Sequence, residues 1–353
     1  MGSTACSGAV ARGLLSPRDR VSGDGAGRAY MQEVFRSPKI MADATVRGDD
    51  TLVIGFSFHP YPRPGAGPLA QLDQKRAFGF SLADVVCQMS FPYPIEETQQ
   101  CLAALAAFAR PFRRVVTFGE SLGGFAALNF AAHLGAETAI ASSPPYTLSP
   151  EKMPSENRWG IYTRSVNAFP WDHIEKGLAV LRRLYLLYDA ATPDAAHIAA
   201  ITALAPQAVH LTVPFGGHPV SRIMNQGGTM AGLIAAMVEG TLEPVQFRQA
   251  VRASRRRSQT YLRNLAAAQP GRRDPLRVRL LEMSQALEPT AHTLLAMLPP
   301  LVRLGRKEEV QALSRSLVET DAAYARRLNT LKKENDALKR QIAELTRRLA
   351  APS

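Results

Sequence analysis

One serine stands where a run typical of a β-strand meets a run typical of a helix. The residues around it read GESLG, so Ser121 lies between Gly119 and Gly123. A turn this tight forces the serine backbone toward an unusual conformation, and the residues two positions away on either side must be small. The turn would project the Ser121 hydroxyl above the carboxyl ends of the strands, where open α/β sheets bind ligands. These residue types at this spacing indicate a nucleophilic serine.

The strand, the G-x-S-x-G turn and the helix together resemble the α/β-hydrolase superfamily over about residues 50–240. In that family an acid and then a histidine follow the serine along the chain. The resemblance implies that His218, which follows the strand-like run AVHLTVPF and two glycines, is the histidine. Two aspartates compete for the acid. Asp189 ends the preceding strand-like run, whereas Asp194 follows Thr192–Pro193, which is typical of a helix start. We expect Asp189 to be the acid, with Asp194 as the alternative.

The same resemblance implies two backbone N–H groups that stabilise an oxyanion. The first belongs to Leu122, which begins the helix after the serine, so the helix dipole adds positive potential there. The second is expected at the end of the first core strand, where the N–H of Phe58 is the candidate. The sequence departs from the family at this strand end, because Phe56–Ser57 replaces the common His-Gly pair. The resemblance implies neither a metal ion nor a cofactor.

Short runs of β-branched and aromatic residues, bounded by Gly, Pro or Ser, are typical of the strands that would position these groups. Helical patterns lie between several of them, at 95–110, 122–135 and 193–205. Strands that alternate with helices predict a mainly parallel sheet with helices on both faces, here over residues 48–240. The expected strands are 51–58, 84–90, 113–120, 137–144, 183–189 and 208–215.

Two stretches fall outside this alternation. Residues 1–47 are rich in Gly, Ser and Arg without a sustained period, so we expect a mostly disordered tail. Met31 and Met41 are methionines at which translation could start instead. Residues 143–173 are dominated by proline and aromatic residues, and a connection of this length in a compact domain is often a lid or a binding loop.

After Gly240 the patterns are helical throughout, which predicts an all-α region over 241–317 and a coiled coil over 318–350. Near the end, apolar residues recur at alternating spacings of three and four, with a single asparagine among them. Leucine at every d position and a lone asparagine at an a position favour two parallel strands, so we expect a parallel homodimer. An amphipathic helix packed on its own domain is the alternative. The heptad seam comprises Leu328, Leu331, Asn335, Leu338, Ile342, Leu345 and Leu349.

Positive charge is concentrated in the same region. The chain carries a net charge of +12, and residues 241–353 hold 22 lysines and arginines against 11 acidic residues. Such a segment can attract nucleic acid, anionic lipid or an acidic polymer, or it can be a solvated helical surface. A basic leucine zipper needs a dense basic helix directly ahead of the seam, but the segment VETDAAYARR carries acids there. We therefore do not expect nucleic-acid binding.

The apolar runs are too short to span a bilayer, and Arg12 interrupts the N-terminal stretch that would have to form a secretory leader. Three cysteines, Cys6, Cys87 and Cys101, are too few and too scattered for a disulfide framework or a metal cluster. We therefore expect a cytoplasmic protein.

The leading hypothesis is a serine hydrolase of the esterase kind, which cleaves or transfers an acyl ester through Ser121, His218 and Asp189. Residues 119–150 are also similar to esterase-like domains found beside bacterial surface-polysaccharide assembly enzymes, which implies a carbohydrate ester as substrate. The alternative is a catalytically weak, hydrolase-like scaffold that acts through its dimeric helical tail. The departure at Phe56–Ser57 and the size of the tail favour that alternative.

Overall fold

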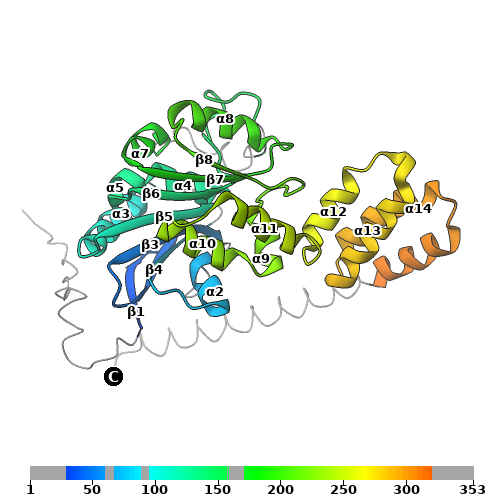
Figure 1. Cartoon of the computed structure of the whole chain (residues 1–353), viewed down its shortest axis with the longest axis horizontal. Coiled ribbons are helices and arrows are strands. Elements are labelled where there is room, and N and C mark those ends of the chain that lie inside the picture. Colours follow the sequence, from blue (N-terminus) through cyan, green and yellow to red (C-terminus); the bar gives the residue numbers. More distant parts are fainter. Residues whose placement is uncertain (1–28, 60–66, 89–94, 157, 159–170, 320–353) are drawn as a thin grey trace, which may run out of the picture. The chain divides into compact units, whose positions relative to one another are not determined.

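The computed structural model describes residues 29–59, 67–88, 95–156, 158 and 171–319. The chain divides into two compact units, Met1–Arg257 and Ser258–Ser353. The first unit contains strands and helices, and the described part of the second is helical (Figure 1).

A sheet forms the centre of the first unit (Figure 1). Its strands are β1 (Tyr30–Arg36), β2 (Ile40–Val46), β3 (Thr51–His59), β4 (Ser81–Gln88), β5 (Arg114–Glu120), β6 (Thr138–Ser142), β7 (Arg183–Tyr188) and β8 (Val209–Thr212). Within the described residues the sheet has 8 strands in the order β1-β2-β4-β3-β5-β6-β7-β8. Neighbours from β4 to β8 are parallel, whereas β2 runs antiparallel to both β1 and β4. The predicted mainly parallel sheet is confirmed.

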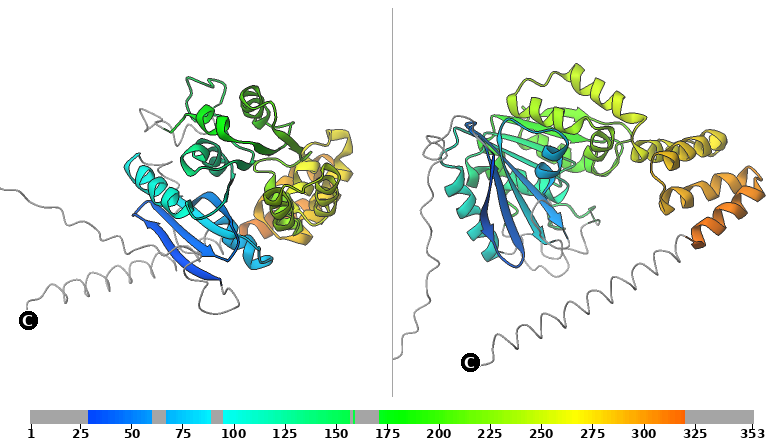
Figure 2. Two further views of the ribbon diagram at one scale, coloured as in Figure 1. Left: turned by 60° about the vertical axis from the view of Figure 1, so that its left-hand side comes forward. Right: turned by 90° about the horizontal axis from the view of Figure 1, so that it is seen from below.

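Helices cover both faces of this sheet (Figures 1 and 2). They are α2 (Pro68–Lys75), α3 (Ile95–Ala109), α4 (Leu122–Asn129), α5 (Ala131–Leu134), α7 (Ile174–Val180), α8 (Asp194–Leu204), α9 (Ser221–Gly227), α10 (Met230–Glu239) and α11 (Pro244–Arg255). On one face α3, α4, α5 and α7 pack together, and on the other α2, α9, α10 and α11 do so. Because both faces are covered, the central strands are buried on both sides, and every residue of β6 is buried.

All six predicted strands are present, as β3 to β8. The expectation of a disordered tail up to residue 47 is wrong for residues 30–46, because these residues form β1 and β2. β1 is one of the two edge strands of the described sheet, and its residues are half-buried or exposed, with charges at Glu33 and Arg36. Charged, incompletely buried residues are common in edge strands and hide the apolar pattern that identifies a central strand. Residues 1–28 lie outside the described residues.

The second unit begins later than the predicted boundary at 241, because α11 packs on α9 of the first unit. Its elements are α12 (Gln259–Ala267), the 3-10 turn η1 (Gly271–Arg273), α13 (Asp274–Leu287), α14 (Ala291–Arg303) and the helical residues 307–319. Ser258 separates α11 from α12, because its Oγ accepts from the N–H of Tyr261 over 3.1 Å and caps the new helix. The predicted heptad seam lies outside the described residues. Within those residues, every helix is too short or too polar to cross a membrane.

Candidate active site

Ser121 lies between the last residue of β5 and the first residue of α4. Its backbone has φ 55° and ψ −123°, and residues with a side chain rarely adopt a positive φ. The Ser121 N–H donates to the carbonyl oxygen of Ser142, at the end of neighbouring β6, over 2.8 Å. The structure thus has the tight, strained turn that the sequence predicts, with the serine at its apex.

Gly119 and Gly123 are required in this turn for steric reasons. A Cβ on Gly119 would lie 2.1 Å from the carbonyl oxygen of Gly123, and a Cβ on Gly123 would lie 2.1 Å from that of Phe56. Both obstacles are backbone atoms, which cannot rotate away as the end of a long side chain can. The absence of two side chains therefore lets β5, α4 and the end of β3 come into direct backbone contact.

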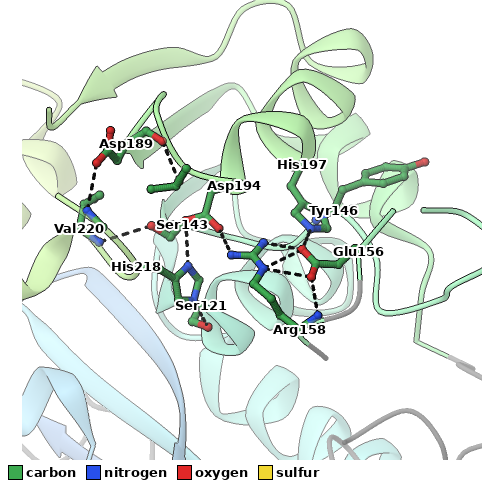
Figure 3. Close-up of polar contacts among 12 residues, drawn as sticks. Ser121, Ser143, Tyr146, Glu156, Arg158, Asp189, Asp194, His197, His218 and Val220 are labelled. Atoms are coloured by element: carbon green, nitrogen blue, oxygen red, sulfur yellow. Dashed lines mark hydrogen bonds and ion pairs between the residues drawn. The ribbon is translucent and has the colours of Figure 1, made fainter. Parts of the chain in front are cut away.

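His218 belongs to the loop after β8 and faces the serine (Figure 3). Its Nε2 lies 2.7 Å from Ser121 Oγ. The loop is held from the side of β6, because the Val220 N–H donates to Ser143 Oγ over 3.4 Å. Sequence reasoning did not single out Ser143, because no local pattern records a contact with a loop so far away in the chain.

Asp194, not Asp189, contacts the imidazole. The Oδ2 of Asp194 lies 2.8 Å from Nδ1 of His218, on the ring side opposite the serine (Figure 3). Asp194 is the first residue of α8 and is 1% exposed. The sequence-based preference for Asp189 is therefore wrong about the geometry, and the alternative residue occupies the position of the acid.

Asp189 lies close by and has a different task. Its buried carboxylate accepts the N–H of Ala191 through Oδ1 and the N–H of Gly217 through Oδ2, each over 3.1 Å. Both donors are backbone groups of the loops after β7 and β8. Asp189 therefore fixes the residue before His218 without touching the imidazole. Sequence spacing did not distinguish the two aspartates, because the difference between them is the direction of the side chain.

The second oxygen of Asp194 accepts a charged hydrogen bond from Arg158, whose Nη1 lies 2.7 Å from Oδ1. Burial by itself would raise the pKa of Asp194, but the hydrogen bonds and charges of His218 and Arg158 outweigh it and hold that pKa below its ordinary value. The carboxylate is therefore ionised at neutral pH. Arg158 lies in the predicted lid, residues 143–173, and sequence reasoning did not single it out.

The first of the two predicted oxyanion donors directly follows the serine. α4 begins at Leu122, so the Leu122 N–H is among the first-turn groups that an α-helix leaves without an intrahelical acceptor. Phe58 pairs with Cys87 in the parallel register of β3 and β4. The close approach of Gly123 to the carbonyl of Phe56 brings the end of β3 beside the turn. The oxyanion role of both N–H groups stays a prediction.

The two cysteines among the described residues lie in the core. Cys87 and Cys101 are buried and are not joined by a disulfide, and burial raises the pKa of the Cys101 thiol to about 12. The thiolate is the nucleophilic and metal-binding form of cysteine, so Cys101 acts as a core residue. In the part of the chain that the structure describes, no three side chains of His, Cys, Asp or Glu gather as metal ligands would.

The sheet and the site agree on one architecture. A mainly parallel sheet carries a serine on a strained turn between β5 and α4, an acid after β7 and a histidine after β8. The first unit has the α/β-hydrolase fold. The fold implied by the GESLG motif is therefore confirmed, and strand β1 extends this α/β-hydrolase domain back to Tyr30.

No protein-family model matches the chain, and no curated protein matches it in sequence. Solved structures similar to it include carboxyl esterase 2 from the mycorrhizal fungus Tuber melanosporum, at 12% identity and a TM-score of 0.46 over 62% of this chain and 88% of that one. A hormone-sensitive lipase from a metagenome library has 11% identity and a TM-score of 0.44 over 68% and 93%. The esterase Pf2001 of Pyrococcus furiosus has 12% identity and a TM-score of 0.41 over 65% and 96%. At these values the likeness says nothing about substrate or activity.

Proposed function

We propose that this chain is a serine hydrolase that cleaves an acyl ester through a triad of Ser121, His218 and Asp194. The observation that carries the proposal is the continuous hydrogen-bonded chain from Ser121 Oγ to His218 Nε2 over 2.7 Å and from His218 Nδ1 to Asp194 over 2.8 Å. A serine with only a structural role has no need of a strained backbone or of a histidine paired with a buried acid.

In the first half of the reaction, Ser121 Oγ attacks the acyl carbon while His218 Nε2 takes its proton. Asp194 keeps the other imidazole proton on Nδ1 and stabilises the positive charge that forms. The oxyanion of the tetrahedral intermediate would be bound by the N–H groups of Leu122 and Phe58. Collapse of the intermediate breaks the bond to the alcohol, which leaves with the proton from His218, and the acyl group stays on Ser121.

In the second half, His218 takes a proton from a water molecule as that water attacks the acyl carbon. The bond from the acyl carbon to Ser121 Oγ then breaks, His218 returns the proton to Oγ, and the acid leaves. A second alcohol that replaces the water would turn the same machinery into an acyltransferase, and both outcomes use the same residues. A carbohydrate ester is the substrate class that we propose, on the similarity of residues 119–150 to esterase-like domains of polysaccharide assembly.

A fluorophosphonate probe tests the proposal, because it reacts only with an activated serine. We expect intact-mass analysis to find one adduct on the wild-type chain, none on Ser121→Ala, and one on the control Ser314→Ala, whose serine lies on an exposed helix of the second unit. Turnover of p-nitrophenyl acetate should fall by roughly 10⁴-fold or more in Ser121→Ala. A wild-type chain without an adduct would favour the scaffold hypothesis instead.

A further inference from the structure

A second row of charged and polar groups lies behind the triad acid (Figure 3). Arg158 donates to Asp194 on one side and to Glu156 on the other, where its Nε lies 2.9 Å from Oε2. Glu156 Oε2 also lies 2.8 Å from Nε2 of His197, on α8. The side chains of Asp194, His197 and Glu156 are 2%, 1% and 9% exposed, and that of Arg158 is 28% exposed, so the row is shielded from water for most of its length.

The direction of these hydrogen bonds follows from one backbone group. The N–H of Tyr146 donates to Nδ1 of His197 over 3.0 Å, so Nδ1 is an acceptor and the ring proton lies on Nε2. Nε2 then donates to Glu156, which also accepts the backbone N–H of Arg158 over 2.7 Å. Burial opposes ionisation, but the hydrogen bonds from Arg158 and His197 outweigh it and lower the pKa of Glu156 to about 2. Glu156 is therefore an anion throughout the neutral range.

The three charges in this row balance to a single negative charge. Asp194 and Glu156 are anions and Arg158 is a cation between them. Arg158 alone would cancel most of the field with which Asp194 stabilises a protonated His218, because it touches the same carboxylate. Glu156, on the far side of the guanidinium, restores the net negative charge that the imidazole faces.

We propose that Arg158 and Glu156 are positioning residues of the triad acid: Arg158 orients the carboxylate of Asp194, and Glu156 offsets the guanidinium charge so that His218 still works as a base. The proposal rests on the proposed serine hydrolase. Arg158 fixes Oδ1, which leaves Oδ2 directed at Nδ1 of His218. Both residues belong to the connection between β6 and α7, so this connection completes the triad from outside the sheet.

Other charged groups lie near His218 and stay constant in the test, among them Asp189, which accepts the N–H of Gly217, and Glu120. Glu120 precedes the serine on β5, and burial raises the pKa of Glu120, while polar and charged neighbours that include Arg222 and His218 offset this only in part. Arg222 belongs to α9. Because Glu120, Arg222 and Asp194 are unchanged in every variant below, a difference between variants reports on Arg158 and Glu156.

The experiment is the pH dependence of kcat/KM for p-nitrophenyl acetate, whose acid limb reports the essential base. Arg158→Gln removes a positive charge near the imidazole, so we expect the acid limb to move to higher pH. Glu156→Gln removes a negative charge, so we expect it to move to lower pH. Each variant should move the acid limb by about half a pH unit to one pH unit. In the double variant the acid limb should lie close to its wild-type position.

A charge-conserving variant separates orientation from charge. Arg158→Lys keeps the cation but loses the planar fork that holds the carboxylate, so we expect the acid limb to stay while kcat falls roughly tenfold. The exposed pair of Arg182 and Glu137 provides the matched control, because its side chains are 80% and 55% exposed. Arg182→Gln and Glu137→Gln should leave both the limb and kcat at their wild-type values.

Titration with the fluorophosphonate probe counts the molecules that hold an activated serine, and kcat is calculated per such molecule. Partial misfolding of a variant therefore does not lower the measured kcat. The proposal would be overturned if the acid limb of the pH profile moved in the same direction in Arg158→Gln and in Glu156→Gln. It would also be overturned if the acid limb of Arg158→Gln stayed at its wild-type pH. If Glu156→Gln does not fold, the comparison of Arg158→Gln with Arg158→Lys tests the proposal by itself, because only Arg158→Gln should move the acid limb. A wild-type chain that takes no probe would refute the proposed function instead, and that result is obtained first.

Discussion

At the scale of single residues, the three groups that meet at the site come from three places in the chain. Ser121 stands at the turn before α4, His218 in the loop after β8, and Asp194 at the first position of α8. The first turn of a helix favours a carboxylate, since the unpaired N–H groups there carry partial positive charge. Asp194 therefore combines the helix position that the sequence indicates with a contact that the sequence does not reveal.

The two aspartates give a prediction at this scale. We expect Asp194→Asn to lower kcat for p-nitrophenyl acetate by about 10⁴-fold at neutral pH, because an amide can hold the imidazole in the wrong tautomer and cannot stabilise its charge. Asp189→Asn should cost only roughly tenfold, since it weakens one of two hydrogen bonds to backbone N–H groups. Steady-state kinetics on both variants, normalised by probe titration, checks the order. A larger loss in Asp189→Asn would return the role of the acid to that residue.

At the scale of elements, a buried acid outside the site joins β4 to α2. Asp84 of β4 accepts the N–H groups of Leu69 and Ala70 in the first turn of α2, over 3.1 and 2.7 Å. Burial has the largest effect on the pKa of Asp84 and raises it from the ordinary 3.8 to about 7, although the two hydrogen bonds lower it. The two elements thus depend on a carboxyl group that folding brings into the neutral titration range.

The sign of the resulting pH dependence follows from linkage. The folded-state pKa of Asp84 lies above the unfolded value, so between pH 3.8 and about 7 the native state keeps a proton that the unfolded chain has lost. The stability that this group contributes is present at acid pH and is lost as the pH rises through about 7. We expect the free energy of unfolding of the wild-type chain to fall by on the order of 2 kcal/mol more than that of Asp84→Asn between pH 5 and pH 8.

Urea unfolding at the two pH values measures this difference, with Glu137→Gln as a variant of an exposed acid that should follow the wild type. The prediction fails if the free energy of unfolding changes equally with pH in the wild-type chain and in Asp84→Asn. Asp84 would then ionise in the folded state as freely as in the unfolded one.

At the scale of the whole molecule, the described site residues all belong to the first unit, whereas the predicted dimer seam belongs to the second. The heptad seam with Asn335 at an a position favours a parallel pair, since asparagines at that position hydrogen-bond best with each other in one register. Catalysis and assembly are therefore expected to be separable.

Sedimentation velocity tests this separation. We expect the full chain to sediment as a dimer, and a chain that ends at Glu319 to sediment as a monomer that still takes one fluorophosphonate adduct. A monomeric full chain would favour the alternative in which the C-terminal helix packs on its own domain. Loss of the adduct on shortening would show that the tail takes part in forming the site.

Local sequence was sufficient for several of these conclusions. The strand, the glycine spacing and the helix around Ser121 predicted the tight turn that holds this proposed nucleophile, because the steric demand of such a turn acts between residues that are neighbours in the chain. The same holds for the strands inside the sheet from β4 to β7, whose burial on both faces leaves a continuous apolar run. It does not hold for β1, because an edge strand keeps charges such as Glu33 that disguise its pattern.

The tertiary structure alone decided between Asp189 and Asp194, since both follow β7 and only the direction of each side chain selects the one that meets His218. It also placed Arg158 and Glu156 behind the acid, although 36 residues separate Arg158 from Asp194. Contacts of this kind depend on how a long connection folds back over the sheet, and no periodicity or short motif records that path. The sequence by itself therefore determined the strained turn that holds Ser121 and the class of fold, whereas packing between distant segments determined which carboxylate meets His218 and which charges surround it.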